Sequence, residues 1–293
     1  MAKPVACNPF ASGELVRTLE RLRSKAAEEG RGAPAEAATC SCEGSGYLTD
    51  DLGRTWVFRL CPCFESCDAC LDGHNYERDE RGYEFARECL RCGPPRRTVD
   101  ALNAARLPQQ HDPRSATPKG KAQRELFRLL RGWLKTYERG GDGLTLSGPP
   151  GVGKSFALVA ALRSIVERRR LRVEYLHVPT MLRSQRFAIE AREQQPEAQL
   201  ARWVDAEVLG VDELSDLRTE WQRETLSDLL TARYDARRTT IITTNLGEDD
   251  LLRMFAGDQT GGRGYQAGAR IVSRLAQWAP IVTVGGRDWR RGD

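Results

Sequence analysis

The stretch Ser147-Gly148-Pro149-Pro150-Gly151-Val152-Gly153-Lys154-Ser155 decides the fold of this 293-residue chain. It contains the pattern G-x-x-x-x-G-K-S in full, between an apolar segment at 144–147 and a helical pattern that begins at Lys154. Glycines let the backbone curl so that its amides face phosphate oxygens, and the following helix adds the positive end of its dipole. The sequence therefore predicts a nucleoside triphosphate site made by Gly148, Pro149, Pro150, Gly151, Val152, Gly153, Lys154 and Ser155.

Within this loop, two side chains have predicted roles of their own. Lys154 reaches the β- and γ-phosphates, and Ser155 holds Mg²⁺. A second motif, which is acidic, follows 58 residues after the loop lysine. There the apolar run 208–211 is followed by Asp212 and Glu213. We expect Asp212 to coordinate Mg²⁺ through water and Glu213 to activate the attacking water. The adjacent glutamate favours an ATPase over a kinase or a small GTPase.

Apolar and helical segments alternate on both sides of these motifs. Strands are predicted at 144–147, 173–178, 208–211, 240–244 and 281–284, and helices at 126–137, 154–168, 181–193, 221–236 and 269–276. This alternation predicts an α/β fold in which a parallel sheet has helices on both faces. The strand at 240–244 delivers Asn245, a predicted sensor of the γ-phosphate or the lytic water. The glycine-rich stretch 248–268 is predicted to be a mobile loop.

Eight of the nine cysteines lie within residues 40–92, in close pairs. In a cytosolic protein such pairs bind metal more often than they form disulfides. The spacing predicts a zinc-ribbon-like module with two zinc ions and eight thiolate ligands, leaving Cys7 free: Cys40, Cys42, Cys61, Cys63, Cys67, Cys70, Cys89 and Cys92. The pairing of ligands, His74 as a substitute ligand and an iron–sulfur cluster stay open. Zinc would stabilise a module with few large apolar side chains.

The chain is predicted to have four segments. These are a helical or flexible start at 1–39 with an amphipathic helix at 14–29, the cysteine module at 40–98, a linker at 99–118 and the ATPase domain at 119–293. No run of about 18 apolar residues indicates a membrane span, and no secretory signal is visible, so we expect a cytoplasmic protein.

The net charge of +4 is small, but its distribution is uneven. Residues 101–140 hold nine Lys or Arg against three Asp or Glu, and residues 263–293 hold six against two. Either excess suits a phosphate backbone, although solvated helix faces and one catalytic arginine explain them as well.

Taken together, the motifs resemble those of the DnaC/IstB family of AAA+ ATPases, over roughly residues 104–290. The resemblance rests first on the phosphate loop and on the acidic motif. It also rests on three further segments: Leu230-Thr231-Ala232-Arg233-Tyr234 leading into Thr243-Thr244-Asn245, Arg270-Ile271-Val272-Ser273-Arg274-Leu275, and Gly286-Arg287-Asp288-Trp289-Arg290. It implies a nucleotide switch that self-assembles into a ring or filament, with an arginine from one subunit completing its neighbour's ATP site. By position in the motif, Arg274 is the first choice for that arginine and Arg270 the second. The helical lid of larger AAA+ proteins is expected to be missing.

Two functions follow from this resemblance, and a third belongs to another class of protein. The first is a DnaC-like helicase loader or replication ATPase, whose N-terminal helix and zinc module dock on a replicative helicase while the core binds ATP and DNA, single-stranded DNA being favoured. The second is an IstB-like transposition helper that binds double-stranded DNA and recruits a transposase. The third is a zinc-dependent interaction protein that uses ATP as a slow switch; the intact Glu213 argues against it.

Overall fold

The computed structural model describes residues 42, 45–51, 56–65, 67–71, 73–108, 120–190, 195–257, 263–286 and 288. The chain divides into two units, Met1–Gly44 and Ser45–Asp293. The predicted helix at 14–29 and the residues Cys7 and Cys40 lie outside the described residues.

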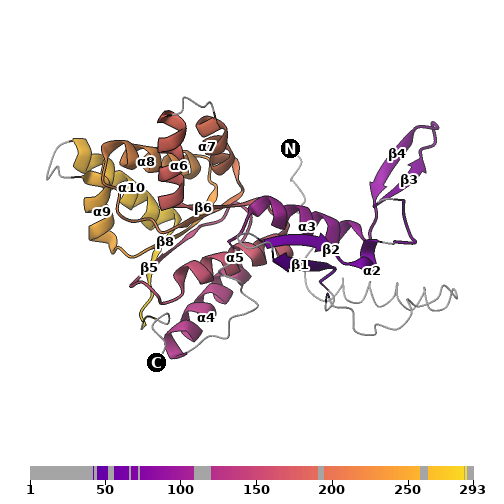
Figure 1. Ribbon diagram of the computed structural model, residues 1–293, viewed down its shortest axis with the longest axis horizontal. Coiled ribbons are helices and arrows are strands. Elements are labelled where there is room, and N and C mark those ends of the chain that lie inside the picture. The colour runs from indigo at the N-terminus through magenta and orange to yellow at the C-terminus, as the bar shows by residue number, and fades with distance from the viewer. Residues whose placement is uncertain are drawn as a thin grey trace, which may run out of the picture. The chain divides into compact units, whose positions relative to one another are not determined.

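A five-stranded, fully parallel sheet forms the centre of this unit (Figure 1). The strand order is β6-β7-β8-β5-β9, so the strand before the phosphate loop lies next to the last strand of the fold. The strands are β5 (Leu144–Ser147), β6 (Val173–His177), β7 (Val208–Asp212), β8 (Thr239–Thr244) and β9 (Ile281–Thr283). The predicted parallel α/β sheet is therefore confirmed.

Helices cover both faces of the sheet because successive strand residues point to opposite sides. Val208 and Ile241 belong to one buried cluster, whereas Leu209 and Ile242 belong to a second. The first cluster includes residues of α4 (Gly120–Thr136) and α5 (Lys154–Arg169); the second includes residues of α6 (Val178–Glu190), α7 (Gln195–Asp205), α8 (Glu220–Asp235), α9 (Glu248–Ala256) and α10 (Arg263–Trp278). Among the described residues, no helix is long and apolar enough to cross a membrane.

The prediction of a mobile loop at 248–268 is wrong for the described part of that stretch. Helix α9 begins at residue 248, the first of the stretch, with three acidic residues in its first turn. Helix α10 begins at residue 263 and includes the end of the stretch. Leu251 and Phe255, four residues apart, are buried against the second cluster. A Cβ on Gly268 would lie 2.8 Å from the backbone nitrogen of Ala256, so this glycine permits close packing of α10 on α9. Residues 258–262 lie outside the described part of the chain.

In the described part of the chain, two antiparallel hairpins and two helices precede the parallel α/β core. The first hairpin joins β1 (Tyr47–Asp51) to β2 (Trp56–Leu60), the second joins β3 (His74–Arg78) to β4 (Glu84–Glu88), and the short α2 (Pro62–Glu65) lies between them. The predicted linker at 99–118 differs from the structure, because its first residues belong to α3 (Gly93–Ala105). Val99 and Leu102 of α3 have their apolar side chains buried in the first cluster, which makes a helix more stable here than an extended connection. The division into four segments stays a prediction.

The first hairpin packs against the helix that follows the phosphate loop. Tyr47 donates a hydrogen bond to Glu167, which also accepts one from Arg163 Nε at 2.7 Å. The Arg163 guanidinium lies 5.3 Å from the centre of the Phe58 ring, within the range of a cation–π contact. Burial raises the pKa of Tyr47, and the hydrogen bond to Glu167 adds to the rise. The hairpin that follows Cys42 is thus attached to α5.

Arg233 of α8 is fully buried and holds three elements together. Its guanidinium donates to the carbonyls of Trp203 and Ala206, at the end of α7, at 2.6 and 2.8 Å, and its Nε donates to Thr240 Oγ1 of β8 at 2.8 Å. Burial lowers the pKa of Arg233, because desolvation disfavours the charged form.

We expect Arg233→Met to lower the free energy of unfolding by at least about 3 kcal/mol, since it leaves several buried carbonyls without a donor. Urea denaturation of the full chain measures the change. The control is Glu224→Met on the exposed face of the same helix, which should change stability by about 0.5 kcal/mol or less. Equal effects of the two substitutions would contradict the role given to Arg233.

Candidate functional site: a nucleotide cavity and a thiolate cluster

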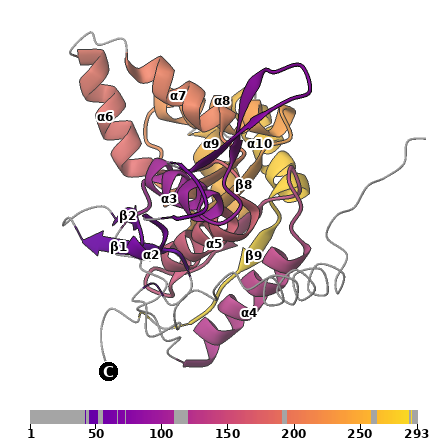
Figure 2. The same cartoon turned by 90° about the vertical axis from the view of Figure 1, so that its right-hand side faces the viewer.

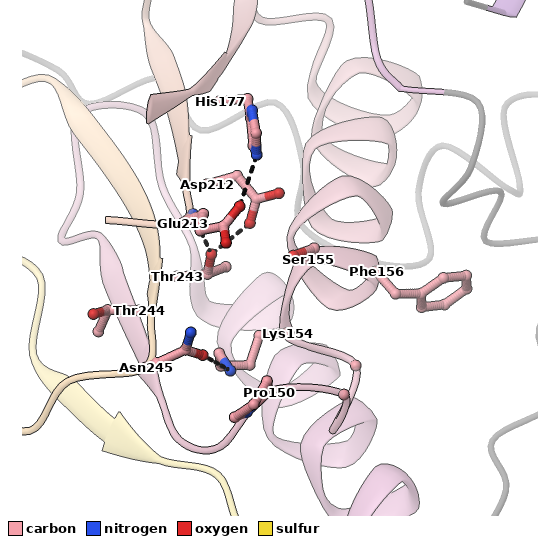
Figure 3. A pocket seen from close by; sticks show the side chains of 12 residues that line it. Pro150, Lys154, Ser155, Phe156, His177, Asp212, Glu213, Thr243, Thr244 and Asn245 are labelled. Atoms are coloured by element: carbon pink, nitrogen blue, oxygen red, sulfur yellow. Dashed lines mark hydrogen bonds and ion pairs between the residues drawn. The ribbon is translucent and has the colours of Figure 1, made fainter. Parts of the chain in front are cut away.

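A cavity of about 380 Å³ opens at the carboxyl ends of β5, β7 and β8 (Figure 3). Its lining brings the phosphate loop, the acidic motif and the predicted sensor to one place. The lining residues are Pro150, Gly151, Gly153, Lys154, Ser155, Phe156, His177, Asp212, Glu213, Thr243, Thr244 and Asn245. Ligands of open parallel sheets bind outside the carboxyl ends of the strands, where this cavity lies.

The phosphate loop has the backbone that its glycines were expected to provide. Gly151 and Gly153 have φ of 80° and 100°, in the left-handed region that glycine adopts without a Cβ clash. A Cβ on Gly148 would lie 2.0 Å from the Val284 carbonyl oxygen, so the first glycine also permits close approach to the segment after β9. Helix α5 begins at Lys154, directly after the loop. The loop amides and the helix N-terminus together suit a polyphosphate.

Lys154 is buried, and its ammonium group donates to three oxygens. The acceptors are the carbonyls of Gly148 at 2.7 Å and Pro149 at 2.8 Å, and Asn245 Oδ1 at 2.8 Å. Loop and sensor are therefore joined through the lysine (Figure 3). A phosphate group would offer the same cation stronger, charged acceptors. The predicted residues Gly148, Pro149 and Val152 shape the loop without lining the cavity.

The two acids after β7 have different surroundings. Asp212 is buried and accepts hydrogen bonds from Tyr175 Oη at 2.7 Å and from Thr243 Oγ1 at 2.5 Å. Burial raises the pKa of Tyr175, and the charge of Asp212 raises it further. These two hydroxyls orient the Asp212 carboxylate, which would bind Mg²⁺ together with Ser155. Mg²⁺ would neutralise phosphate charge during hydrolysis.

Glu213, by contrast, has a side chain that is 50% exposed to solvent. Its backbone has a φ of 61°, and its amide donates to Thr243 Oγ1 at 3.0 Å, which fixes the turn after β7. The carboxylate lies 2.8 Å from His177 Nε2, while His177 Nδ1 lies 2.8 Å from Thr180 Oγ1. Since a carboxylate only accepts, Nε2 carries the proton of this pair. His177 therefore orients the predicted general base (Figure 3).

Sequence reasoning missed His177, Tyr175 and Thr243. In the sheet register His177 lies beside Asp212, so a polar residue at the end of β6 was the available signal. Tyr175 and Thr243 are polar residues inside predicted strands, and a buried hydroxyl there needs a hydrogen-bond partner. Both hydroxyls donate to the carboxylate of Asp212 on the neighbouring strand β7.

The two candidate arginines lie on α10, and neither lines the cavity. Arg274 has its guanidinium 4.9 Å from the centre of the Tyr234 ring and 3.8 Å from Asp235. Its side chain is still 30% exposed. Arg270 is exposed. A role for either arginine at the ATP site of a neighbouring subunit stays a prediction.

Four cysteine sulfurs converge beside the second hairpin. The Sγ atoms of Cys67, Cys70, Cys89 and Cys92 all lie within 4.8 Å of one another. Cys67 and Cys89 are 3.8 Å apart, and Cys70 and Cys92 are 3.4 Å apart. Four sulfurs bound at about 2.3 Å to a tetrahedral zinc ion stand roughly 3.8 Å from one another, so the cluster fits zinc.

The surroundings act in opposite directions on the cysteines of this cluster, since desolvation raises the pKa of Cys70. The backbone amides of Cys92 and Arg91 hydrogen-bond to Cys89 and lower its pKa to about 6. Two cysteine pairs that flank a hairpin agree with the predicted ribbon. Cys61 and Cys63 lie at the end of the first hairpin. Their sharing of a metal with Cys40 and Cys42, and His74 as a ligand, stay predictions.

Zinc analysis of the purified chain tests this assignment. We expect about two zinc ions per chain, and the double variant Cys89→Ser/Cys92→Ser should lose one of them because the tetrahedral site needs four thiolates. Cys7→Ser, the control, should lose none. An unchanged zinc content in the double variant, or iron with a visible charge-transfer band, would contradict a zinc ion at this cluster.

The fold and the cavity define the class: this is a P-loop ATP-binding protein with a parallel α/β core. Residues 87–292 match the family model described as "IstB-like ATP binding protein", and the chain therefore belongs to that family. This confirms the resemblance to the DnaC/IstB family.

Among characterised proteins, the chain is similar to the "Replicative helicase loader DnaI" of Bacillus subtilis (strain 168). The two are 25% identical over 244 residues, which are 78% of this chain and 77% of that protein. Among solved structures, a crystal structure of DnaI matches with a TM-score of 0.50 at 21% identity, over 59% of this chain and 89% of that one. A DnaC helicase loader structure matches with a TM-score of 0.47 at 24% identity, over 60% and 98% of the two chains.

Proposed function

We propose that this protein is an ATP-hydrolysing loader of a replicative helicase. The observation that carries the proposal is the similarity to the DnaI helicase loader, which extends over more than three quarters of both chains. In this proposal ATP binding favours assembly of the loader with helicase and DNA, and hydrolysis triggers release. The protein acts in the cytoplasm, where DNA replication takes place.

Hydrolysis is supported by the arrangement of the cavity. Lys154, Ser155 and Asp212 surround one side of it, where a triphosphate and Mg²⁺ would lie, and Glu213 and Asn245 face the same space. A carboxylate with partial exposure can accept a proton from water that enters beside the γ-phosphate. Asn245 is suited to detect the γ-phosphate, because its side chain already bonds the lysine that would bind it.

Docking on a protein partner is supported by the surface of the second hairpin. Among the described residues, the large apolar side chains that are at least 60% exposed are Leu71, Tyr76, Tyr83 and Leu90, all near this hairpin. Two arginines in the strands of the hairpin are already paired, Arg78 with Glu84 and Arg87 with Glu77. Exposed apolar side chains among neutralised charges suit a protein surface better than a phosphate backbone.

Gel filtration of the full chain with the replicative helicase of the same organism tests this docking. A stable complex in the presence of ATP is expected, and Leu90→Ser/Tyr76→Ser should weaken it while leaving ATP binding intact. The control is Arg218→Ser, on the exposed loop before α8. Absence of any complex, with and without ATP, would count against helicase loading.

A transposition helper remains the second candidate, because the family model that matches is the IstB-like one. Binding to double-stranded DNA together with a transposase from the same organism, and no complex with the helicase, would favour it. A zinc-dependent interaction protein with a slow ATP switch is the third, and it requires negligible ATP turnover even with DNA.

A further inference from the structure

Helix α4 presents a stripe of four cations on one face. Arg124, Arg128, Arg131 and Lys135 follow one another at intervals of four, three and four residues, the spacing at which helical side chains line up. All four are exposed. The opposite face of the helix carries the buried Leu126 and Leu130, so packing against the core holds the stripe toward solvent. Figure 2 shows α4 beside β9, and both elements line a common hollow.

The positive charge of this stripe is not neutralised within the described part of the chain. No ion pair joins any of the four cations to a described acid, although the exposed arginines Arg78, Arg139, Arg218 and Arg253 all have such partners. Helix α4 has a single acidic residue, Glu125, which lies 3.9 Å from Lys121. Three neighbouring like-charge pairs destabilise the helix. A helix face that is only exposed to solvent does not need four charges of the same sign, since interspersed positive and negative charges keep a surface soluble without this repulsion.

Gly132 borders the stripe and gives a second, independent observation. A glycine in a helix interior makes the helix less stable than an alanine would. A Cβ at this position would meet nothing within 4 Å, so packing inside the chain does not require glycine here. Close approach of a ligand to the backbone is a physical reason for an exposed helical glycine.

From these observations we infer that the α4 stripe, Arg124, Arg128, Arg131 and Lys135, binds the phosphodiester backbone of DNA. The inference deepens the proposed function, on whose DNA binding it rests. The stripe covers eleven residues of rise, or about 16 Å, at about 1.5 Å each. A DNA strand presents a phosphate about every 3.4 Å of axis, so four cations can each meet one phosphate. An acidic protein surface offers no such regular row.

Helix α4 also contacts the helix that begins at the nucleotide cavity. Phe127 packs edge-on against Phe156 of α5, with ring centres 5.6 Å apart, and Phe156 lies two residues after the loop lysine. DNA held on the stripe therefore lies one helix away from the ATP site. This contact gives a direct physical route by which DNA alters ATP turnover.

The salt dependence of DNA binding tests the inference on the full chain. Fluorescence anisotropy of a labelled oligothymidylate, and of a duplex of equal length, is measured with ATP between 50 and 200 mM salt. The variant Arg124→Gln/Arg128→Gln/Arg131→Gln/Lys135→Gln should reduce the slope of log K against log salt by about 3 for the single strand or about 4 for the duplex. For the single strand, the wild type's loss of affinity across this salt range should then exceed that of the variant by about 50-fold.

A matched control removes the same charge elsewhere. Arg78→Gln/Arg139→Gln/Arg218→Gln/Arg253→Gln neutralises four exposed arginines that already have acidic partners, and it should leave most of the slope in place. ATP turnover without DNA should be the same in all three proteins. If the stripe variant binds DNA with the wild-type slope, the inference fails while helicase loading stands. If it loses the helicase and keeps DNA, the stripe is a protein contact, which also overturns the inference. If the wild type itself binds no DNA, the DNA-binding part of the proposed function fails as well.

Discussion

Glu213→Gln is expected to lower the kcat of ATP hydrolysis by about 10²–10⁴-fold, the contribution of a positioned general base. The amide can still accept the hydrogen bond from His177 Nε2, now 2.8 Å from the carboxylate, so the geometry of the turn after β7 should persist. It cannot take a proton from the attacking water. Nucleotide affinity should change little, because the loop and Lys154 bind the phosphates on another wall of the cavity.

Steady-state phosphate release measures kcat, and titration with a fluorescent ATP analogue measures affinity. Glu224→Gln is the matched control, since it makes the same chemical change on the exposed face of α8. A rate within a few-fold of wild type in Glu213→Gln would mean that another group activates the water. Loss of nucleotide binding would mean that the substitution damages the site instead.

Arg274→Ala is expected to lower ATP turnover by about 10³-fold, the lower end of the effect of an arginine finger in GTPases. The arginine lies away from the cavity of its own chain, on a tyrosine ring and near an acid, with part of its side chain exposed. It can stabilise the transition state only at the ATP site of a neighbouring subunit. Wild-type turnover per chain should therefore rise steeply with protein concentration.

A mixing experiment separates this role from a structural one. Arg274→Ala keeps its own phosphate loop, whereas Glu213→Gln keeps its own arginine, so mixing the two inactive proteins should restore part of the turnover. Arg270→Ala serves as the comparison, because Arg270 lies one turn earlier on α10 and is also exposed. Turnover that is flat with concentration, or unaffected by Arg274→Ala, would contradict an intersubunit site. A larger loss in Arg270→Ala would transfer the role to that residue.

The sequence predicted the sheet because strand periodicity and motif position agree in this chain. The short apolar runs at 144–147 and 208–211 are bounded by glycine or acidic residues, and their ends carry the loop and the acids that the cavity brings together. The phosphate loop could be located to the residue, since backbone geometry there depends on specific glycines. Local signals were sufficient for this half of the site.

The remaining features depend on partners distant in sequence. His177 acquires its role from Glu213, 36 residues away, through the register of two neighbouring strands. Helix α9 was predicted as loop because glycines dominate the segment that follows it, although Gly268 serves helix packing. Residues 99–105 of helix α3 were assigned to a linker because Pro108, Pro113 and Pro118 follow them, whereas the burial of this helix depends on the hairpin and α5. Such tertiary contacts are not visible in periodicity.

The most direct test of the account is a helicase-loading assay on a closed circle of single-stranded DNA. Purified replicative helicase from the same organism is incubated with the circle, ATP and either wild-type protein or Glu213→Gln, and the helicase bound to the circle is measured after filtration. We predict that wild-type protein increases the bound, active helicase, whereas Glu213→Gln forms the complex and fails to release an active one. An equal amount of active helicase on the circle with and without the wild-type protein, at a concentration where it hydrolyses ATP, would contradict helicase loading.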